Sequence, residues 1–235
     1  MLPRSNLLPL LQRVALFQKF TPSELSEILE LGHMRRIEEG GFFFHQGDQA
    51  DHIYVLTDGR VHLGQVTPDG QQIILRVITP GRMFGAVGVA IPGSVCPAAA
   101  QAIEDSQGIA WESATFRRLG EKNPSLAFDM MGMMNAYVQE IQDRFRELAT
   151  ERTEQRLART ILRLAAQAGR RVNEGVLIDM AITRQDLAQM TGTTLFTVSR
   201  LLSDWERRGL IETGRERVSI LQPHGLVRIA EDLVK

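Results

Sequence analysis

The stretch from Phe42 to Ser113 is a series of short apolar runs separated by turn signals, and it constrains the fold more than any other part of the chain. The runs are rich in β-branched and aromatic residues and include FFFH, HIYVL, VHLGQV, QIILRVI and GIAWES. Turn signals such as QGD, DGR, TPDG and IPGS lie between them. Many short strands divided by turns are typical of an antiparallel roll, barrel or sandwich, and we expect this architecture within residues 1–124.

Two local patterns add detail to this region. TPDG at residues 67–70 has Pro second and Gly fourth, which favours a type I turn. In the run that follows, Ile73, Leu75 and Val77 alternate with Ile74 and Arg76. A period of two predicts a strand with one face toward the core.

Residues 125–149 are predicted to form one long helix, because they contain no Pro and a single Gly. Apolar residues recur every three or four positions and form one stripe. The members of this stripe are Leu126, Met130, Met133, Tyr137, Ile141, Phe145 and Leu148. We expect a parallel copy of the helix to cover the stripe across a dimer axis. The alternative is a helix that packs only on its own β-domain.

The polar run TERTEQR, beginning at Thr150, interrupts the stripe and marks a hinge. We therefore predict an α+β chain with a β-rich domain at 1–124, a dimerisation helix and hinge at 125–152, and a C-terminal domain at 153–235. Within the last domain a helix should end at Ala168, closed by Gly169. Residues 172–182 are predicted to form a short hairpin.

Charge is unevenly distributed along the 235 residues, although the net charge is only −1. Residues 1–149 carry 13 basic and 17 acidic side chains, whereas residues 150–235 carry 14 and 11. This asymmetry indicates that the C-terminal part binds an anion. Most of the basic residues are Arg, which forms bidentate contacts with phosphate or guanine, although a general preference for Arg is an equally good explanation.

Residues 183–209 contain two predicted short helices joined by a tight turn. The first begins at Thr183 with the capping-box sequence TRQD. Gly192, in the sequence TGT, allows the turn a positive φ. Thr194 caps the second helix, which we expect to run to Arg208. Two helices with this connection form a helix-turn-helix unit.

The second helix has two different faces. At about 100° per residue, Val198, Leu201, Leu202 and Trp205 fall on the side of the core. Phe196, Ser199, Arg200 and Ser203 fall on the opposite side, near the helix N-terminus, where a recognition helix contacts bases. The segment LIETGRERVSIL follows as a predicted hairpin, or wing. The candidate DNA-binding residues are Thr183, Arg184, Thr193, Thr194, Leu195, Phe196, Thr197, Ser199, Arg200, Arg215 and Arg217. An ordinary amphipathic helix with Phe196 against a neighbour is the alternative.

Taken in order, these segments resemble the CRP/FNR family of bacterial regulators over essentially the whole chain. HQGDQADHIYVLTDGRV, PDG and PGRMFG resemble the family's cyclic-nucleotide-binding roll, and ITRQDLAQMTGTTLFTVSRLL resembles its DNA-binding unit. The resemblance implies a homodimeric transcription regulator that binds a near-palindromic operator on double-stranded DNA. It also implies RNA polymerase as a partner and an effector bound in or near the roll.

The segment after FG departs from the cyclic-AMP-binding members of the family. Those members have Glu and then Arg-Ser there, whereas this chain has Ala86 and Cys96-Pro97. A buried phosphate would lack its bidentate arginine, so we expect an effector other than cyclic AMP. The expected effector pocket comprises Phe84, Gly85, Ala86, Val87, Cys96, Met133, Tyr137 and Ile141.

A second departure lies in the predicted recognition helix. Arg200 matches the family's guanine-reading arginine, but Phe196 stands where many members have Glu. We therefore expect an altered half-site. This chain does not resemble the iron–sulfur members of the family, because it lacks the N-terminal cysteine cluster that holds their iron–sulfur centre.

No cofactor is identified from the sequence, and three alternatives stay open. A haem-based gas or redox sensor of the same family would use ligands among His33, His45, His52, His62 and Cys96, although none has metal-ligand spacing. A redox sensor at the lone Cys96 is the second. A cupin-like metalloenzyme with a DNA-binding tail is the third, and we expect no enzyme activity and no metal.

The N-terminal segment MLPRSNLLPLLQRVALF is predicted to form a short helix and not a signal peptide. Together with the lone cysteine, this prediction favours a cytoplasmic protein without membrane contact.

Overall fold

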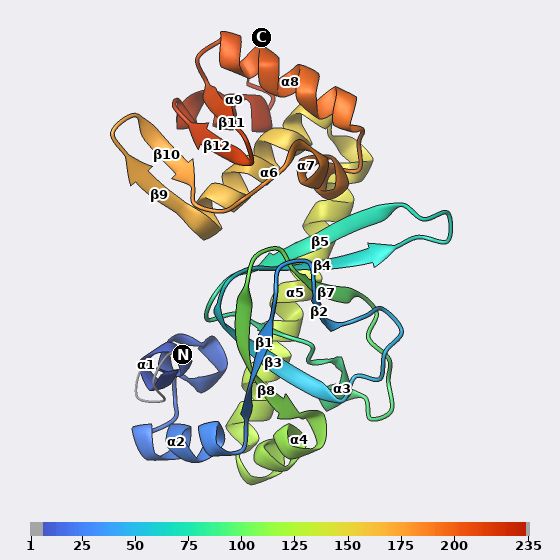
Figure 1. Ribbon diagram of the computed structural model, residues 1–235, viewed down its shortest axis with the longest axis vertical. Coiled ribbons are helices and arrows are strands. Elements are labelled where there is room, and N and C mark those ends of the chain that lie inside the picture. The colour runs from blue at the N-terminus through green and yellow to red at the C-terminus, as the bar shows by residue number, and fades with distance from the viewer. Residues whose placement is uncertain (1–6, 234–235) are drawn as a thin grey trace. The chain divides into compact units, whose positions relative to one another are not determined.

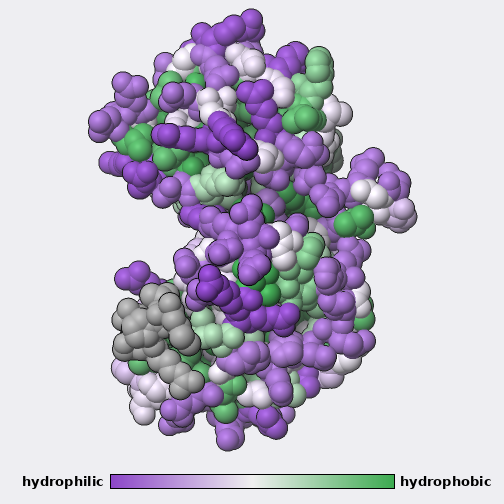
Figure 2. Space-filling view, viewed as in Figure 1, coloured by the Kyte–Doolittle hydropathy of each residue, from purple (hydrophilic) through white to green (hydrophobic). Residues whose placement is uncertain are grey.

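The computed structural model describes residues 7–233, and the chain divides into two compact units at the bond between Val138 and Gln139. This boundary falls inside helix α5 (Pro124–Thr150), which is continuous across it (Figure 1). Both units present a mainly hydrophilic surface on the face shown in Figure 2. Within residues 7–233, no helix has the length and apolarity needed to cross a membrane.

The first unit is built on two antiparallel four-stranded sheets, which confirms the predicted roll. One sheet has the order β1-β8-β3-β6, formed by His33–Ile37, Ser106–Glu112, His52–Asp58 and Met83–Phe84. The other has the order β2-β7-β4-β5, formed by Phe42–Phe44, Ala99–Ala102, Val61–Val66 and Gln72–Ile78. The predicted turn at 67–70 is present, since Gly70 N donates to the Thr67 carbonyl at 2.9 Å.

Two hydrophobic cores hold this unit together. Side chains of both sheets meet in an aromatic core in which Tyr54 stacks on Phe84 with ring centroids 5.1 Å apart. The second core joins the β1-β8-β3-β6 sheet to the helices, and its Trp111 Nε1 donates to the Ile28 carbonyl at 2.7 Å. The helices of this unit are α1 (Leu7–Arg13), η2 (Ala15–Phe17), α2 (Pro22–Glu30), α3 (Val87–Ala90) and α4 (Ser113–Lys122), followed by α5. Residues 1–6 of the predicted N-terminal helix lie outside the described residues.

The strand that follows the turn at 67–70 does not have the predicted simple alternation. A β-bulge shifts the register between Leu63 and Gly64, because Leu63 pairs with Arg76 whereas Gly64 pairs with Ile74. As a result Ile74 is buried and Ile73 is exposed. The period of two was therefore wrong over this strand, since an inserted residue changes the face on which the following side chains lie.

The apolar stripe of helix α5 is wider than predicted, and part of it is covered by the helix's own unit. Leu126 is fully buried in the core of its own unit, and Met130 and Met133 pack against the same core. Tyr137 is half-buried, with the Arg76 guanidinium 5.7 Å from its ring. Leu126 is therefore not accessible to a second copy, and its place in the predicted seam was wrong, whereas the seam contacts of Met130, Met133 and Tyr137 stay a prediction. The large exposed apolar residues of the helix are Phe128, Met131, Met134, Val138, Ile141, Phe145 and Leu148.

The second unit contains helices around a small sheet of order β11-β12-β10-β9. Its elements after α5 are α6 (Thr153–Ala168), β9 (Gly169–Val172), β10 (Gly175–Ile178), α7 (Arg184–Thr191), α8 (Leu195–Arg207), β11 (Ile211–Gly214), β12 (Arg217–Ile220) and α9 (Pro223–Ala230). The first hairpin therefore spans 169–178, and the predicted bounds of 172–182 were too late in the chain.

Gly169 follows α6 as predicted, but its conformation is extended, with φ −80° and ψ 133°. The reason for glycine is close approach, because a Cβ at residue 169 would overlap the Ala165 carbonyl oxygen.

Candidate nucleic-acid interface

The two helices α7 and α8 begin with the predicted caps. Thr183 Oγ1 accepts from Asp186 N at 3.0 Å, and Asp186 Oδ2 accepts from Thr183 N at 2.8 Å, forming a capping box at α7. Thr194 Oγ1 accepts from Thr197 N at 3.2 Å at the start of α8. Thr183, Thr194 and Thr197 therefore stabilise the helix N-termini through these hydrogen bonds, whether or not they also contact DNA.

The turn between the two helices depends on Gly192. This residue has φ 62° and ψ 44°, the left-handed conformation that glycine adopts without strain. Its N–H donates to the Ala188 carbonyl, which ends α7. The turn places Thr193, half-buried, and Leu195, exposed, at the entrance to α8.

Helix α8 has the two faces that its periodicity predicts. Val198, Leu201, Leu202 and Trp205 are buried, and Trp205 Nε1 donates to Glu154 Oε1 at 3.0 Å. On the outer face Arg200 and Ser203 are exposed and Ser199 is half-buried. Phe196 is 76% exposed, so it does not pack against a neighbour within this chain. An exposed aromatic ring next to an arginine, one turn into a helix, suits contact with base edges.

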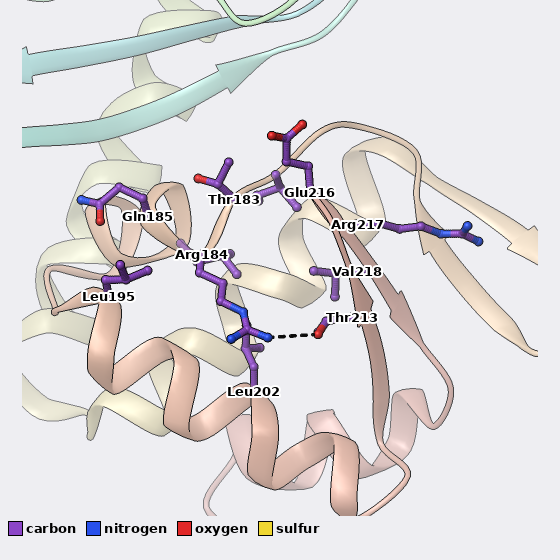
Figure 3. A pocket seen from close by; sticks show the side chains of 12 residues that line it. Thr183, Arg184, Gln185, Leu195, Leu202, Thr213, Glu216, Arg217 and Val218 are labelled. Atoms are coloured by element: carbon purple, nitrogen blue, oxygen red, sulfur yellow. Dashed lines mark hydrogen bonds between the residues drawn. The ribbon is translucent and has the colours of Figure 1, made fainter.

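A hollow of about 320 Å³ lies between the start of α7, the start of α8 and the wing formed by β11 and β12 (Figure 3). Thr183, Arg184 and Leu195 line it together with Thr213 and Glu216. Arg184 Nη2 donates to Thr213 Oγ1 at 3.4 Å across this hollow. Of the predicted DNA-binding residues, the structure brings Thr183, Arg184, Leu195 and Arg217 around this hollow, whereas Phe196, Arg200 and Arg215 do not line it.

The two wing arginines differ in position. Arg215 is exposed in the turn between β11 and β12. Arg217, at the start of β12, extends away from Arg184 (Figure 3) and also lines a second hollow with Arg170 and Arg171. The side chains of Arg184 and Arg217 therefore point in different directions, although both residues line the first hollow.

Two residues of this region were missed by the sequence analysis. Glu206, near the end of α8, accepts from Thr213 N at 2.8 Å and from Thr213 Oγ1 at 2.6 Å. The two residues are seven positions apart and belong to different elements. Neither matches a local motif, so no signal in the sequence identified the pair.

The predicted effector residues do not form a single cluster. Phe84 lies in the core between the sheets, whereas Ala86 and Met133 pack on the core of the other sheet face. Gly85 and Val87 flank Ala86, which precedes α3. Tyr137 lies beneath Arg76, and Ile141 is exposed in the second unit.

Cys96 is buried beside acidic groups. Its N–H donates to the Asp48 carbonyl at 2.8 Å, and its carbonyl accepts from Gly47 N at 2.9 Å. Burial, reinforced by the negative charges of Asp48 and Asp51, raises the pKa of the Cys96 thiol. A protonated thiol is a poor nucleophile, which argues against rapid redox sensing at this position.

The histidines considered as haem ligands are dispersed over the roll. The rings of His33 and His52 meet edge to face at 5.8 Å, the ring of His45 lies on Phe42 at 4.3 Å, and His62 is buried. Among the residues described, no group of three or more His, Cys, Asp or Glu side chains is arranged to hold a metal ion.

Comparison with known proteins matches each unit to a family. Residues 34–123 match the cyclic nucleotide-binding domain, and residues 155–229 match the Crp-like helix-turn-helix domain. The anaerobic regulatory protein of Bacillus subtilis (strain 168) is 26% identical over 207 residues, which cover 88% of this chain and 87% of that protein. The chain belongs to the CRP/FNR family of transcription regulators.

Other CRP/FNR relatives align over nearly the full length. The CRP-like cAMP-activated global transcriptional regulator of Mycobacterium tuberculosis (strain ATCC 25618 / H37Rv) is 23% identical over 221 residues, covering 94% of this chain and 98% of its own. The structure of FixK2 from Bradyrhizobium japonicum shares the fold, with a TM-score of 0.76 and 20% identity over 84% of this chain and 96% of that one. CRP/FNR regulators bind DNA and are dimeric, and this chain has both domains of that architecture.

Proposed function

We propose that this CRP/FNR regulator binds a near-palindromic operator as a homodimer in the cytoplasm, with RNA polymerase as a partner. The observation that carries the proposal is the outer face of α8, where Phe196 in the first turn and Arg200 in the second turn are both exposed. Arg184 and Arg215 lie on elements that flank the same hollow and supply positive charge for phosphate. The other proposed DNA-contact residues are Thr183, Thr193, Thr194, Leu195, Thr197, Ser199 and Arg217.

The exposed apolar face of α5 supports the dimer. At about 100° per residue, Met131, Met134, Val138, Ile141, Phe145 and Leu148 fall within an arc of about 100°. Their spacing alternates three and four residues, the a and d pattern of a parallel coiled coil. Ile141, Phe145 and Leu148, which the sequence places in the dimer stripe, belong to this face. A second copy of the helix would remove these side chains from water.

We propose that an unidentified small molecule, other than cyclic AMP, controls the regulator from the β-roll domain at 1–124. The thiol of Cys96 supplies no positive charge to a phosphate group. Asp48 and Asp51 lie beside the thiol, and their negative charges would repel a phosphate. Residues 125–152 then serve as dimerisation helix and hinge, and 153–235 as the DNA-binding domain.

Selection of binding sites from random double-stranded DNA by the purified full chain tests this function. We expect a sequence logo with two inverted half-sites whose centres lie about one helical turn apart. Sedimentation of the free protein at micromolar concentration should give a dimer. A monomer that selects no sequence would overturn the proposal.

A further inference from the structure

The wing is attached to α8 through one carboxylate oxygen. Glu206 Oε1 accepts both hydrogen bonds from Thr213, one from the backbone N–H at 2.8 Å and one from the hydroxyl at 2.6 Å. Both side chains are half-buried. A hydrogen bond to a charged acceptor is stronger than a neutral one, so this contact fixes the position of β11 against the helix.

The hydroxyl of Thr213 also has a fixed orientation. Its single hydrogen is directed to Glu206, so its oxygen is left as an acceptor toward the hollow. Arg184 Nη2 occupies that side at 3.4 Å (Figure 3). Arg184, Thr213 and Glu206 therefore form one chain of hydrogen bonds whose donors all point toward the carboxylate.

The wing is also held from its other side. Ile182 N, in the segment before α7, donates to the Glu216 carbonyl at 3.1 Å. The turn that carries Arg215 is thus held through Thr213, which lies before the turn in β11, and through the carbonyl of Glu216, which lies in the turn. Of these two attachments, the one to Glu206 connects the turn to the helix that bears Phe196 and Arg200.

From this geometry we infer that Glu206 is a positioning residue for DNA binding. It touches no base or phosphate itself, and its negative charge alone would repel DNA. Through Thr213 it holds the Arg215 turn and the guanidinium of Arg184 at a set distance from the outer face of α8. The two phosphate-binding arginines and the base-reading face then meet the duplex together. This inference rests on the proposed DNA-binding function.

Matched substitutions in the full chain separate positioning from charge. Glu206→Met removes the acceptor and one negative charge, whereas Glu206→Gln keeps an acceptor oxygen. Glu212→Met removes the same charge from an exposed site on β11. Thr213→Val removes the hydroxyl with little change of shape, and Thr213→Ser restores it. Affinity for the selected operator is measured by fluorescence anisotropy over a series of salt concentrations, with thermal unfolding as the test of folding.

We expect Glu206→Met and Thr213→Val to weaken operator binding about tenfold, or about 1.4 kcal/mol. The slope of log affinity against log salt should become shallower by about one, as one phosphate contact is lost. Glu206→Gln and Thr213→Ser should stay within about threefold of wild type, and Glu212→Met should bind at least as tightly as wild type. When Arg184 and Arg215 are both Ala, Glu206→Met should lower operator affinity by less than about twofold, since the side chains that Glu206 positions are absent.

Four outcomes would overturn the inference. Full affinity of Glu206→Met, or weakening in both Glu206→Met and Glu212→Met, would remove the positioning role. If Glu206→Met still weakened operator binding about tenfold when Arg184 and Arg215 are both Ala, Glu206 would act through groups other than these two arginines. If Arg184→Ala and Arg215→Ala both left operator affinity unchanged, the proposed phosphate contacts would fail first, and the inference would fall with them. If Glu206→Met does not fold, Thr213→Val decides.

Discussion

Arg163 of α6 donates through Nη1 to both carboxylate oxygens of Glu147 in α5, at 2.6 and 2.9 Å. The Glu147 side chain is 9% exposed and that of Arg163 is 30% exposed. Arg163 Nη2 also donates to Thr160 Oγ1, so the guanidinium keeps a second partner. Loss of this ion pair would therefore leave the Glu147 carboxylate buried without its cation, whereas the Arg163 guanidinium would keep a hydrogen bond and contact with water.

Breaking this pair should have unequal consequences for stability. Arg163→Met leaves a buried carboxylate without its partner and should lower the free energy of unfolding by about 2–3 kcal/mol. Glu147→Met leaves an arginine that water still reaches and should cost less than about 1 kcal/mol. The double variant should be more stable than Arg163→Met alone. Urea denaturation checks the order, and equal costs for the two single changes would contradict it.

The exposed face of α5 predicts which charge insertions abolish dimerisation. Ile141→Glu places a carboxylate in the proposed seam and should raise the dimer dissociation constant at least about 100-fold, because the charge would be buried without a partner. Gln139→Glu adds the same charge off the seam and should leave the dimer intact. Sedimentation velocity over a concentration series measures both. A fully dimeric Ile141→Glu variant would show that the copies meet elsewhere.

Cyclic AMP should not bind tightly. Ala86, Cys96 and Pro97 supply no cation for the cyclic phosphate, and Asp48 and Asp51 lie beside the thiol. Titration calorimetry at micromolar protein should therefore give no saturable heat with cyclic AMP. A dissociation constant below 1 μM would refute the prediction.

Base readout by Phe196 and Arg200 should be separable. Arg200 is expected to donate to guanine O6 and N7, so Arg200→Ala should relax one position of the half-site at a cost of about 1–3 kcal/mol. Phe196 makes no hydrogen bond and should pack against a thymine methyl, so Phe196→Ala should relax a neighbouring A·T pair. Arg215→Ala should weaken all sequences alike and flatten the salt dependence. Selection from random DNA with each variant decides, and an unchanged site for Phe196→Ala would remove its proposed role.

His52 should make the roll less stable in mild acid. Burial is the main cause of its lowered pKa, with His33 and Arg35 adding to the effect and Asp51 and Glu112 opposing it. Because the folded pKa lies below the ordinary 6.5, the unfolded chain binds more protons between the two values, and stability rises with pH there. The contribution is complete above pH 6.5 and is lost as the pH falls toward the folded pKa. His52→Gln should reduce this slope in urea denaturation between pH 5 and 8. An unchanged slope in His52→Gln would assign the acid sensitivity to other groups.

Features encoded by neighbouring residues were predictable from the sequence. The caps at Thr183 and Thr194 and the positive φ of Gly192 depend on contacts within a few residues, so their motifs were sufficient. The buried and exposed faces of α8 followed from its period for the same reason.

Features that depend on distant segments were not predictable in this way. Periodicity showed that α5 has apolar positions but could not tell Leu126, covered by its own unit, from Ile141, which is exposed. The bulge next to Ile74 and the hydrogen bonds between Glu206 and Thr213 arise from contacts between separate elements. Hydrophobic pattern carries no information about which surface covers a given face.

The continuity of α5 through Val138 has a consequence for the phase of its exposed apolar residues. These residues lie on both sides of Val138, from Met131 to Leu148, on one unbroken helix. One residue inserted after Val138 would turn those that follow it by about 100° about the helix axis relative to those that precede it, whereas seven would add about two turns and nearly restore the original phase. Dimerisation through this face should therefore vary periodically with the number of residues inserted.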